Sequence, residues 1–245
     1  MDSTLKNYLT SLKVDYSVNS SSVIVLTTLP YAFYYVDQSN LKNYKELLNL
    51  REKVKQNHQK LLVFVWWDLW QYKTDVVKSK ISHIVGKSIK IHARKTNIVS
   101  INKTEAMAFQ QQNHLSVPLP GFKRYGLILN DEIIALAVFA KKRKFNDGSF
   151  SAELLRFSTK NNVHINGGLS KLIKPYLNTY NINSLMTYVD LDWSDGSKFE
   201  KIGFKIINYQ PPMFFKLKNN VRQLSTPEKF DVLNMGSLKL LLDNV

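Results

Sequence analysis

The order of segments between residues 123 and 218 restricts this chain to a fold that mixes strands and helices. Two apolar runs, KRYGLIL and EIIALAVFAK, flank a turn at Asn130-Asp131 and predict a β-hairpin. A third strand-like run, SFSAELLRFST, comes before a helical run that ends at Tyr180. A strand (SLMTYVD), a short helix (SDGSKFEKI) and two closing strands (GFKIINY and PMFFKLK) complete the order β-β-β-α-β-α-β-β. We therefore expect an α/β chain, of the α+β kind, in which helices flank a mixed sheet.

Two adjacent glycines, Gly167 and Gly168, open the longer helical run, although the chain has only nine glycines. A helix N-terminus presents unpaired N–H groups and a partial positive charge, and glycine lets the backbone approach an anion closely. Ser170 and Lys171 add a hydroxyl and a cation in the first turn. A tight turn without a ligand would use the same glycines, so the pair indicates either a turn or a phosphate site.

The chain carries 34 Lys+Arg against 19 Asp+Glu, a formal net charge of +15. Such an excess favours a polyanionic partner, and we predict nucleic acid, with DNA ahead of RNA. A Lys-rich and Asn-rich composition without any such partner would give the same total. The positive charge is also clustered, in one group of Lys141, Lys142, Arg143 and Lys144 and another of Lys87, Lys90, Arg94 and Lys95.

Several classes of protein are disfavoured by composition. The chain has no cysteine, which excludes disulfides, cysteine–zinc sites and thiol catalysis. Its five histidines lack close ligand spacing, so we expect no metal site. No apolar run approaches the length of a membrane span, and the first residues do not resemble a signal peptide. We expect an intracellular, cytoplasmic location and no membrane partner, whereas the sequence leaves the oligomeric state open.

Residues 1–88 show a different order of segments and predict a separate small α/β module. Residues 22–36 read as two strands broken at Pro30, residues 40–57 as a helix and residues 60–67 as a buried strand. Another helix is expected at 74–85, capped by Thr74 and ended at Gly86.

The second predicted domain covers residues 89–245. It begins with a strand in SIKIHARKTNIVSI and a helix at 103–113, which precede the segments described above.

The phrase KFEKIGF at 198–204, together with the segment order, resembles the GCN5-related N-acetyltransferases. The resemblance implies acetyl-CoA or a related acyl-CoA as the donor. It implies that Phe157 and Ser158 pair with the pantetheine arm as an added strand would. It also implies that the pyrophosphate is held through the backbone amides of Gly167, Gly168, Leu169, Ser170 and Lys171.

A further set of strings (NHL at 113–115, AVF, ELLRF, GGLSKL, YVDLDWSDG and NMGSLKLLL) is similar to phage-encoded relatives of Mom-type DNA-modifying acyltransferases. That resemblance implies modification of an exocyclic amine of a DNA base, and it points to Ser170, Arg156 and His114. Arg156 could instead pair with Glu153 within the sheet, and His114 could simply cap a helix.

Acyl transfer to an amine needs a base for the amine and an acid for the leaving thiolate. Members of the acetyltransferase family often place a tyrosine where this chain has Phe199, which cannot donate a proton. Tyr188, Ser170 and Ser194 are the remaining candidates for the acid. Asp190, at the end of a predicted strand, is the candidate base or substrate ligand. Alternatively, Asp195-Gly196 is only a turn and Asp192 or Ser194 is a helix cap.

The run LLVFVWWDLWQYKTDVVKSKISHIVG in the first region resembles very-short-patch-repair-type endonucleases, in a degenerate form. A nuclease of that class needs acidic groups and a histidine around Mg²⁺. The chain offers Asp15, Asp37, His58 and Asp68 for that role. Its neighbouring tryptophans, Trp66, Trp67 and Trp70, fit a core or a surface that stacks on bases.

Three functions follow for testing. The first is a DNA-acting acyltransferase, the second an endonuclease of the homing or repair type that uses the acetyltransferase-like part for recognition, and the third a DNA-binding protein without catalysis.

Overall fold

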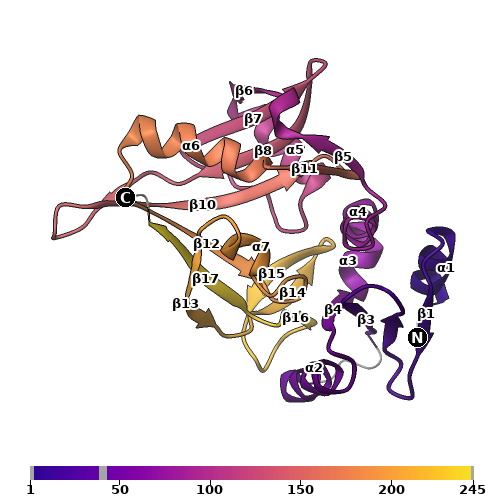
Figure 1. Cartoon of the computed structure of the whole chain (residues 1–245). Helices are drawn as coiled ribbons and strands as arrows, with labels where there is room; N and C mark the ends of the chain where they lie inside the picture. Colours follow the sequence, from indigo (N-terminus) through magenta and orange to yellow (C-terminus); the bar gives the residue numbers. More distant parts are fainter. Residues whose placement is uncertain (1–2, 39–42, 244–245) are drawn as a thin grey trace. The chain divides into compact units, whose positions relative to one another are not determined.

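The structure is a computed structural model that describes residues 3–38 and 43–243. The chain divides into two compact units. The first unit comprises Met1–Lys87, Val189–Asp195 and Tyr209–Leu238, and the second comprises Ser88–Tyr188, Gly196–Asn208 and Lys239–Val245. Each unit combines sheet and helix (Figure 1), which confirms the predicted mixed α/β class. The first unit thus includes two segments from beyond residue 188.

The first unit is built on a four-stranded sheet of order β1-β2-β3-β4, in which β3 and β4 are parallel. A smaller sheet of order β15-β14-β16 belongs to the same unit. The elements are α1 (Ser3–Ser11), β1 (Tyr16–Val18), β2 (Ile24–Leu26), β3 (Tyr31–Val36), α2 (Tyr44–His58), β4 (Leu61–Trp66), α3 (Trp67–Tyr72), α4 (Thr74–Ile84), β14 (Phe214–Lys218), β15 (Val221–Ser225) and β16 (Val232–Leu233).

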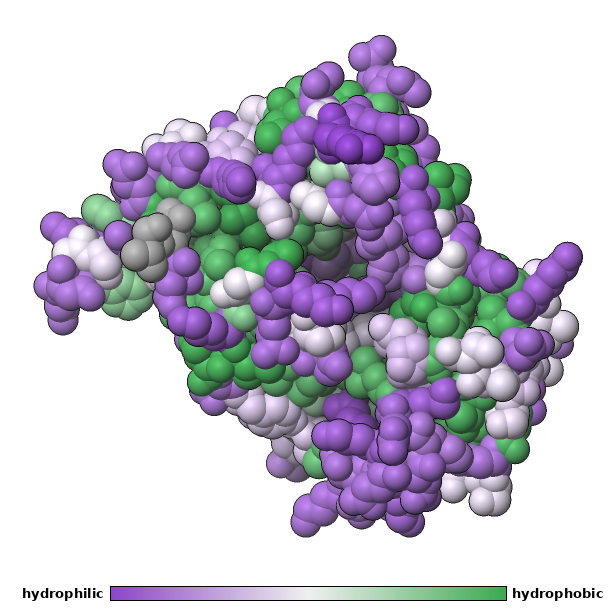
Figure 2. Space-filling view, in the orientation of Figure 1, coloured by the Kyte–Doolittle hydropathy of each residue, from purple (hydrophilic) through white to green (hydrophobic). Residues whose placement is uncertain are grey.

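Helix α2 follows its sequence pattern, since Leu47, Leu50 and Val54 are buried, whereas Asn49, Glu52 and Lys53 are exposed. Figure 2 shows hydrophilic side chains gathered over this helix at the bottom of the view. Its N-cap is Asn43, whose side chain accepts a hydrogen bond from the backbone N–H of Glu46. The first predicted residues of this helix, 40–42, lie outside the described residues.

The predicted cap of the next helix is wrong. Helix α4 has Lys73 at its N-cap, and Thr74 instead donates its hydroxyl to the carbonyl of Trp70, 2.6 Å away. The reason is that another short helix, α3, runs into this position, so the carbonyls of its last turn offer an acceptor that sequence spacing does not reveal. Trp66 and Trp70 are buried, as a core role predicts.

The second unit contains most of an eight-stranded sheet with strand order β13-β17-β12-β10-β8-β7-β6, to which β9 adds by pairing with β10. The chain enters the first unit at the last residues of β12 and again at the last residues of β13. It returns to the second unit after Asp195 and again after Leu238, near the start of β17. The elements are β5 (Ile89–His92), a 3₁₀ turn η1 (Ala93–Lys95), β6 (Asn97–Ser100), α5 (Lys103–Asn113), β7 (Lys123–Leu129), β8 (Glu132–Phe139), β9 (Arg143–Lys144), β10 (Phe150–Thr159), β11 (Val163–Asn166), α6 (Gly168–Tyr180), β12 (Ser184–Asp190), α7 (Ser197–Glu200), β13 (Lys205–Gln210) and β17 (Ser237–Asp243).

Helices α5 and α6 cover opposite faces of this sheet. Ala106 and Phe109 of α5 pack with Val138 of β8 in one buried cluster. The next residue of β8, Phe139, stacks on Tyr176 of α6 with ring centroids 4.2 Å apart. Because neighbouring residues of a strand point to opposite faces, the two helices must lie on the two sides of β8. This arrangement places the start of α6 on one face and the end of α5 on the other.

The predicted hairpin and its turn are confirmed. Asn130 and Asp131 both have positive φ, 50° and 61°, as a two-residue hairpin turn of the favoured twist requires.

The strand predicted in SIKIHARKTNIVSI is instead two short strands, β5 and β6, separated by η1. A further strand, β11, stands between β10 and the glycine pair and pairs in parallel with β5. These strands are only four residues long, and their pairing joins segments about 75 residues apart, so no local pattern announces them.

None of the helices among residues 3–38 and 43–243 is both long and apolar enough to span a membrane.

Candidate functional site

Strands β10 and β12 lie in parallel at one end and then separate. They pair only at Ser151–Glu153 with Ser184–Met186. Beyond this ladder the side-chain hydroxyl of Thr187 donates to the carbonyl of Leu154 at 3.0 Å, and the remainder of β10 is not paired with β12. An irregularity in β10 between Leu154 and Arg156 accompanies the separation. The later part of β10 therefore presents one backbone edge that no described strand pairs with on the β12 side.

The two glycines at the start of α6 have different structural causes. Gly167 is the N-cap, is exposed, and has φ +74°, a left-handed conformation that side chains with a Cβ disfavour. Gly168 is buried, and a Cβ added there would stand 2.7 Å from Cγ2 of Ile165. The pair thus provides the turn and also a close approach of α6 to β11. The exposed Gly167 leaves the helix N-terminus open toward solvent, and the proposed pyrophosphate contacts remain a prediction.

Other predicted donor contacts occupy definite places. Leu169 and Ser170 are half-buried in the first turn of α6. The Lys171 ammonium donates to the backbone carbonyls of Ala93, at 2.8 Å, and of Thr96. Lys171 is therefore bound by protein carbonyls, and no local pattern predicts this because the partners lie 75 and 78 residues away along the chain.

Phe157 and Ser158 lie in the separated part of β10, where they pair with Ala137 and Leu136 of β8. Since Leu136 belongs to the cluster under α5, Ser158 faces α5 and Phe157 faces α6. The Ser158 hydroxyl is buried without a hydrogen-bond partner among the described residues. Any pairing with a pantetheine arm would thus involve the backbone at these positions.

Arg156 is half-buried and donates to the carbonyls of Leu155, at 2.7 Å, and Val117, at 3.3 Å. Burial lowers the pKa of Arg156, and the charge of Glu153 acts in the opposite direction. Its direct hydrogen bonds therefore go to backbone carbonyls, whereas Glu153 acts through its charge. A role for Arg156 in substrate binding remains a prediction.

His114 and Tyr188 both belong to the second unit, but they lie on different elements. His114 is the C-cap of α5, and its Nδ1 accepts a hydrogen bond from the backbone N–H of Ser116 at 3.0 Å. The position of His114 at the end of α5 fits the capping interpretation, although its ring bonds an N–H beyond the helix, and the catalytic interpretation stays a prediction. Tyr188 stands exposed in the part of β12 beyond the ladder with β10.

Asp190 is the last residue of β12 and belongs to the first unit. Its Oδ1 accepts the backbone N–H of Asp192 at 2.9 Å. Part of the Asp190 side chain is accessible to solvent, yet protein atoms crowd it, and the resulting desolvation raises its pKa. The charges of Arg222, Lys80 and Arg51 act in the opposite direction.

Asp192 is a functional candidate, and the alternative that it caps the following helix is wrong. The N-cap of α7 is Gly196. Asp192 is fully buried, its Oδ1 accepts the backbone N–H of Met235 at 2.8 Å, and its Oδ2 is buried without a hydrogen-bond partner among the described residues. Desolvation and the neighbouring charge of Asp190 raise the pKa of Asp192 well above its ordinary value. No sequence signal reveals this, because the burial depends on residues more than 40 positions away.

The first unit also holds a buried ion pair. Both oxygens of Asp68 accept from Arg222, at 2.7 and 2.8 Å. The guanidinium lies over the rings of Trp66 and Phe215, at 5.8 and 5.5 Å from their centroids. Asp68 was a candidate nuclease acid, but its two oxygens are occupied by Arg222. Within residues 3–38 and 43–243, no three His, Asp or Glu side chains gather as a metal site would require.

The predicted cationic residues are placed differently from one another. Lys141, Arg143 and Lys144 are exposed, as are Arg94 and Lys95 on η1.

Lys142 is half-buried, and its ammonium donates to the carbonyl of Tyr180 at 2.8 Å and lies 3.9 Å from the ring centroid of Phe150. Tyr180 is the last residue of α6, where a cation complements the helix dipole. Lys142 thus has a structural role beside any contact with nucleic acid.

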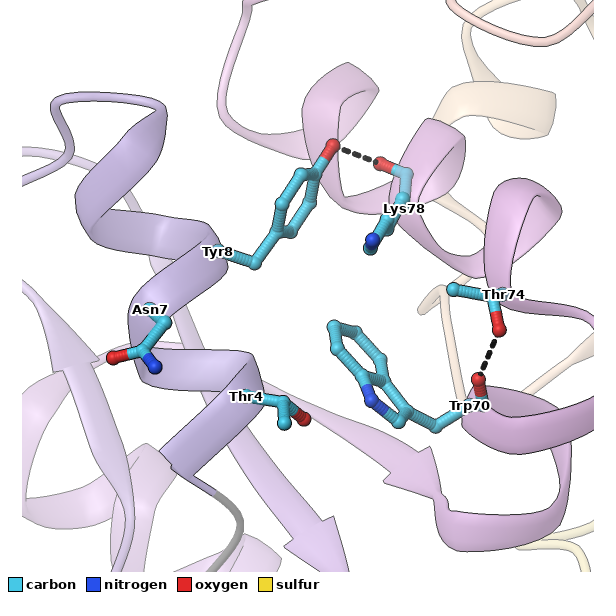
Figure 3. A pocket seen from close by; sticks show the side chains of 6 residues that line it. All are labelled: Thr4, Asn7, Tyr8, Trp70, Thr74 and Lys78. Atoms are coloured by element: carbon cyan, nitrogen blue, oxygen red, sulfur yellow. Dashed lines mark hydrogen bonds between the residues drawn. The ribbon is translucent and has the colours of Figure 1, made fainter.

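A shallow groove of about 400 Å³ lies in the first unit between α1, α3 and α4 (Figure 3). Tyr8 donates its hydroxyl to the carbonyl of Lys78 at 3.1 Å and meets Trp70 edge-on, with ring centroids 6.3 Å apart. Trp70 and Thr74 line this groove, and none of the predicted donor-binding residues does.

No known protein family matches the chain, and no curated protein matches it. Solved acetyltransferase structures superpose on part of it. A Bacillus subtilis acetyltransferase in complex with CoA is 16% identical, with a TM-score of 0.44 over 62% of this chain and 100% of that one. Arabidopsis thaliana Naa50 with a bisubstrate analogue is 11% identical (TM-score 0.43, 61% and 99%), and the Escherichia coli ribosomal-protein-S18-alanine N-acetyltransferase is 13% identical (TM-score 0.41, 60% and 93%).

Proposed function

We propose that the chain is an N-acyltransferase whose second unit holds an acyl-CoA donor. The observation that carries this proposal is the separation of β10 from β12 beyond Glu153 and Met186. An extended pantetheine arm has amide groups that can pair with an open strand edge, as an added strand does. The N-terminus of α6, which begins directly after Gly167, supplies N–H groups and a partial positive charge for the phosphates. The predicted resemblance to GCN5-related N-acetyltransferases supports the same assignment.

The proposed reaction joins the amine nitrogen to the thioester carbonyl carbon and breaks the carbon–sulfur bond. The leaving thiolate takes a proton, and the amine loses one. Tyr188 is the proposed proton donor, since this tyrosine is an exposed residue of β12 and Phe199 has no hydroxyl. The base that takes the amine proton is left open by this proposal, and Asp190 stays a sequence-based candidate for it.

The proposed acceptor is an exocyclic amine of a DNA base. Support comes from the net charge of +15, from the exposed cations Lys141, Arg143 and Lys144, and from the resemblance to phage-encoded Mom-type acyltransferases. An exocyclic amine is paired inside a duplex, so the base would have to be flipped out or single-stranded to react.

The proposal is tested by incubating the full chain with isotope-labelled acetyl-CoA and single-stranded DNA, followed by mass spectrometry of the nucleosides. A labelled nucleoside is expected with the wild type, and much less with Tyr188→Phe. Tyr16→Phe, which removes the same hydroxyl from a strand of the first unit, is the matched control and should behave as the wild type. If the folded protein binds CoA but no labelled acetyl group is found on DNA or on any other amine, the proposal of acyl transfer is wrong.

A further inference from the structure

Lys171 is a cation in the first turn of a helix, where the partial positive charge of the N-terminus disfavours it. The structure shows what holds it there. Its ammonium donates to the carbonyls of Ala93 and Thr96 and lies 3.5 Å from the Thr96 hydroxyl. These partners are 75 and 78 residues away along the chain. Lys171 therefore joins the first turn of α6 to the turn between β5 and β6.

The position of that turn is set by the parallel pairing of β5 with β11. Asn166 of β11 is opposite His92 of β5. Both strands therefore end at the same end of the ladder, where β11 continues into α6 and β5 continues into η1. The two exits stay close, since a Cβ built on Gly167 would lie 3.9 Å from the Cβ of Ala93. The turn itself is closed by Thr96, which is 3% exposed and donates its hydroxyl to the Ala93 carbonyl at 2.7 Å.

The turn carries two exposed cations, Arg94 and Lys95. Because the Lys171 ammonium is already bound to carbonyls of this turn, it is less available than Arg94 and Lys95 to bind a phosphate. Arg94 and Lys95 are held beside the start of α6 by the same contacts, and their side chains face solvent. A clamp made by one lysine thus brings two other cations to the helix N-terminus.

We propose that Lys171 is a positioning residue that fixes the 93–96 turn against α6, so that Arg94 and Lys95 bind the phosphates of the CoA donor. This inference rests on the proposed function, and it assigns Arg94 and Lys95 to the donor where the sequence analysis assigned them to nucleic acid. Both side chains can donate hydrogen bonds to phosphate oxygens, lysine as a compact charge and arginine as a planar group with two parallel N–H donors.

The test uses the full chain and three variants. Lys171→Met removes the clamp, Lys174→Met removes an exposed lysine of the same helix as the matched control, and Arg94→Gln with Lys95→Gln removes the two cations. Amide hydrogen exchange of residues 93–97 is measured without ligand. The dissociation constant of CoA is then measured by calorimetry at several salt concentrations, and the affinity for a duplex oligonucleotide is measured beside it.

We expect exchange in the turn to become about tenfold faster in Lys171→Met and to stay unchanged in Lys174→Met. CoA should bind about tenfold more weakly to Lys171→Met and to the double variant, since hydrogen bonds of charged groups are lost in each. Salt should weaken CoA binding as steeply in Lys171→Met as in the wild type, and less steeply in the double variant, because only the latter loses cations that face the phosphates.

Unchanged exchange in Lys171→Met would overturn the clamp. A flattened salt dependence in Lys171→Met would show that the ammonium itself contacts phosphate and would overturn the positioning role. A double variant that loses oligonucleotide affinity but keeps CoA affinity would show that Arg94 and Lys95 bind nucleic acid and not the donor. A wild-type chain that binds no CoA would contradict the proposed function and the donor role of these cations, while the exchange result would still decide the clamp by itself.

Discussion

The glycine pair at the start of α6 provides a prediction whose size follows from the structure. A Cβ on Gly168 would stand 2.7 Å from Cγ2 and 3.1 Å from Cβ of Ile165, and 3.4 Å from Cδ1 of Leu127. Carbon atoms normally rest about 3.5–4.0 Å apart, so a shift of about 1 Å is needed. Ile165 is 6% exposed and β-branched, so its Cγ2 cannot turn away without a new side-chain rotamer in a packed site. Helix α6 must therefore move from β11.

Overpacking of this kind costs about 1–3 kcal/mol. Alanine gains up to about 1 kcal/mol over glycine in a helix, so the net loss for Gly168→Ala should be about 1–2 kcal/mol. Gly167→Ala should lose a similar amount, about 1–2 kcal/mol, for another reason, because its φ of +74° strains any residue with a Cβ. Asparagine tolerates that conformation better, so Gly167→Asn should be milder than Gly167→Ala, whereas Gly168→Asn should be worse than Gly168→Ala.

Hydrogen exchange of the α6 amides measures these losses within the second unit, and Gly148→Ala provides the matched control. Gly148 has φ +84° and no atom within 4 Å of an added Cβ, so it reports strain without a clash. Ile165→Ala removes the clashing methyl and should make Gly168→Ala less costly than the sum of the two single changes. The reasoning is refuted if Gly168→Ala protects α6 as well as the wild type, or if the two changes are simply additive.

Three further predictions concern the buried charges and the proposed acid. Asp68→Ala should lower the stability of the first unit by about 3–5 kcal/mol because it leaves the Arg222 guanidinium buried without its partner, whereas the double variant Asp68→Leu with Arg222→Met should lose less stability. Tryptophan fluorescence in urea measures both losses, since all four tryptophans are in the first unit. Equal losses in the two variants would contradict the prediction. The raised pKa of Asp192 means that the folded chain binds a proton which the unfolded chain releases above about pH 4, so stability should fall as pH rises from there toward the folded-state pKa. Asp192→Asn should flatten that slope in urea titrations at several pH values, and an unaltered slope would show that Asp192 is not its source. Tyr188→Phe should lower kcat for acyl transfer by about 10²-fold or more and leave CoA binding unchanged, and a wild-type kcat would remove Tyr188 from the mechanism.

The elements that could be predicted from sequence are those whose signals are local. Helix α5 was placed at its observed bounds, and Asn102 at its N-cap accepts from the backbone N–H of Glu105, a contact between residues three apart. The hairpin turn at Asn130-Asp131 is also a local matter of positive φ. Helix α1 was missed, although Leu5 and Leu9 pack on its buried side, because nine residues with a modest apolar stripe give a weak pattern.

The features of the site that could not be predicted depend on contacts across long stretches of chain. Lys171 read as a phosphate ligand, yet its carbonyl partners lie on a turn more than 70 residues earlier. A helix cap is one sequence-based interpretation of Asp192, yet its burial and its bond to Met235 come from segments that only the fold brings together. A pattern of residue types shows which groups are available, and the pairing of distant strands decides which of them stay open to a ligand.

The claim that a CoA donor lies along the separated part of β10 is tested most directly by a hydrogen-exchange footprint of CoA on the full chain. The account predicts slower exchange at residues 155–159 of β10 and at 167–170 at the start of α6. The ladder at 151–153 and the amide of Lys171, which donates to the Gly167 carbonyl, should be unaffected because they are already paired. Protection confined to other segments, or binding that leaves both regions unchanged, would contradict it.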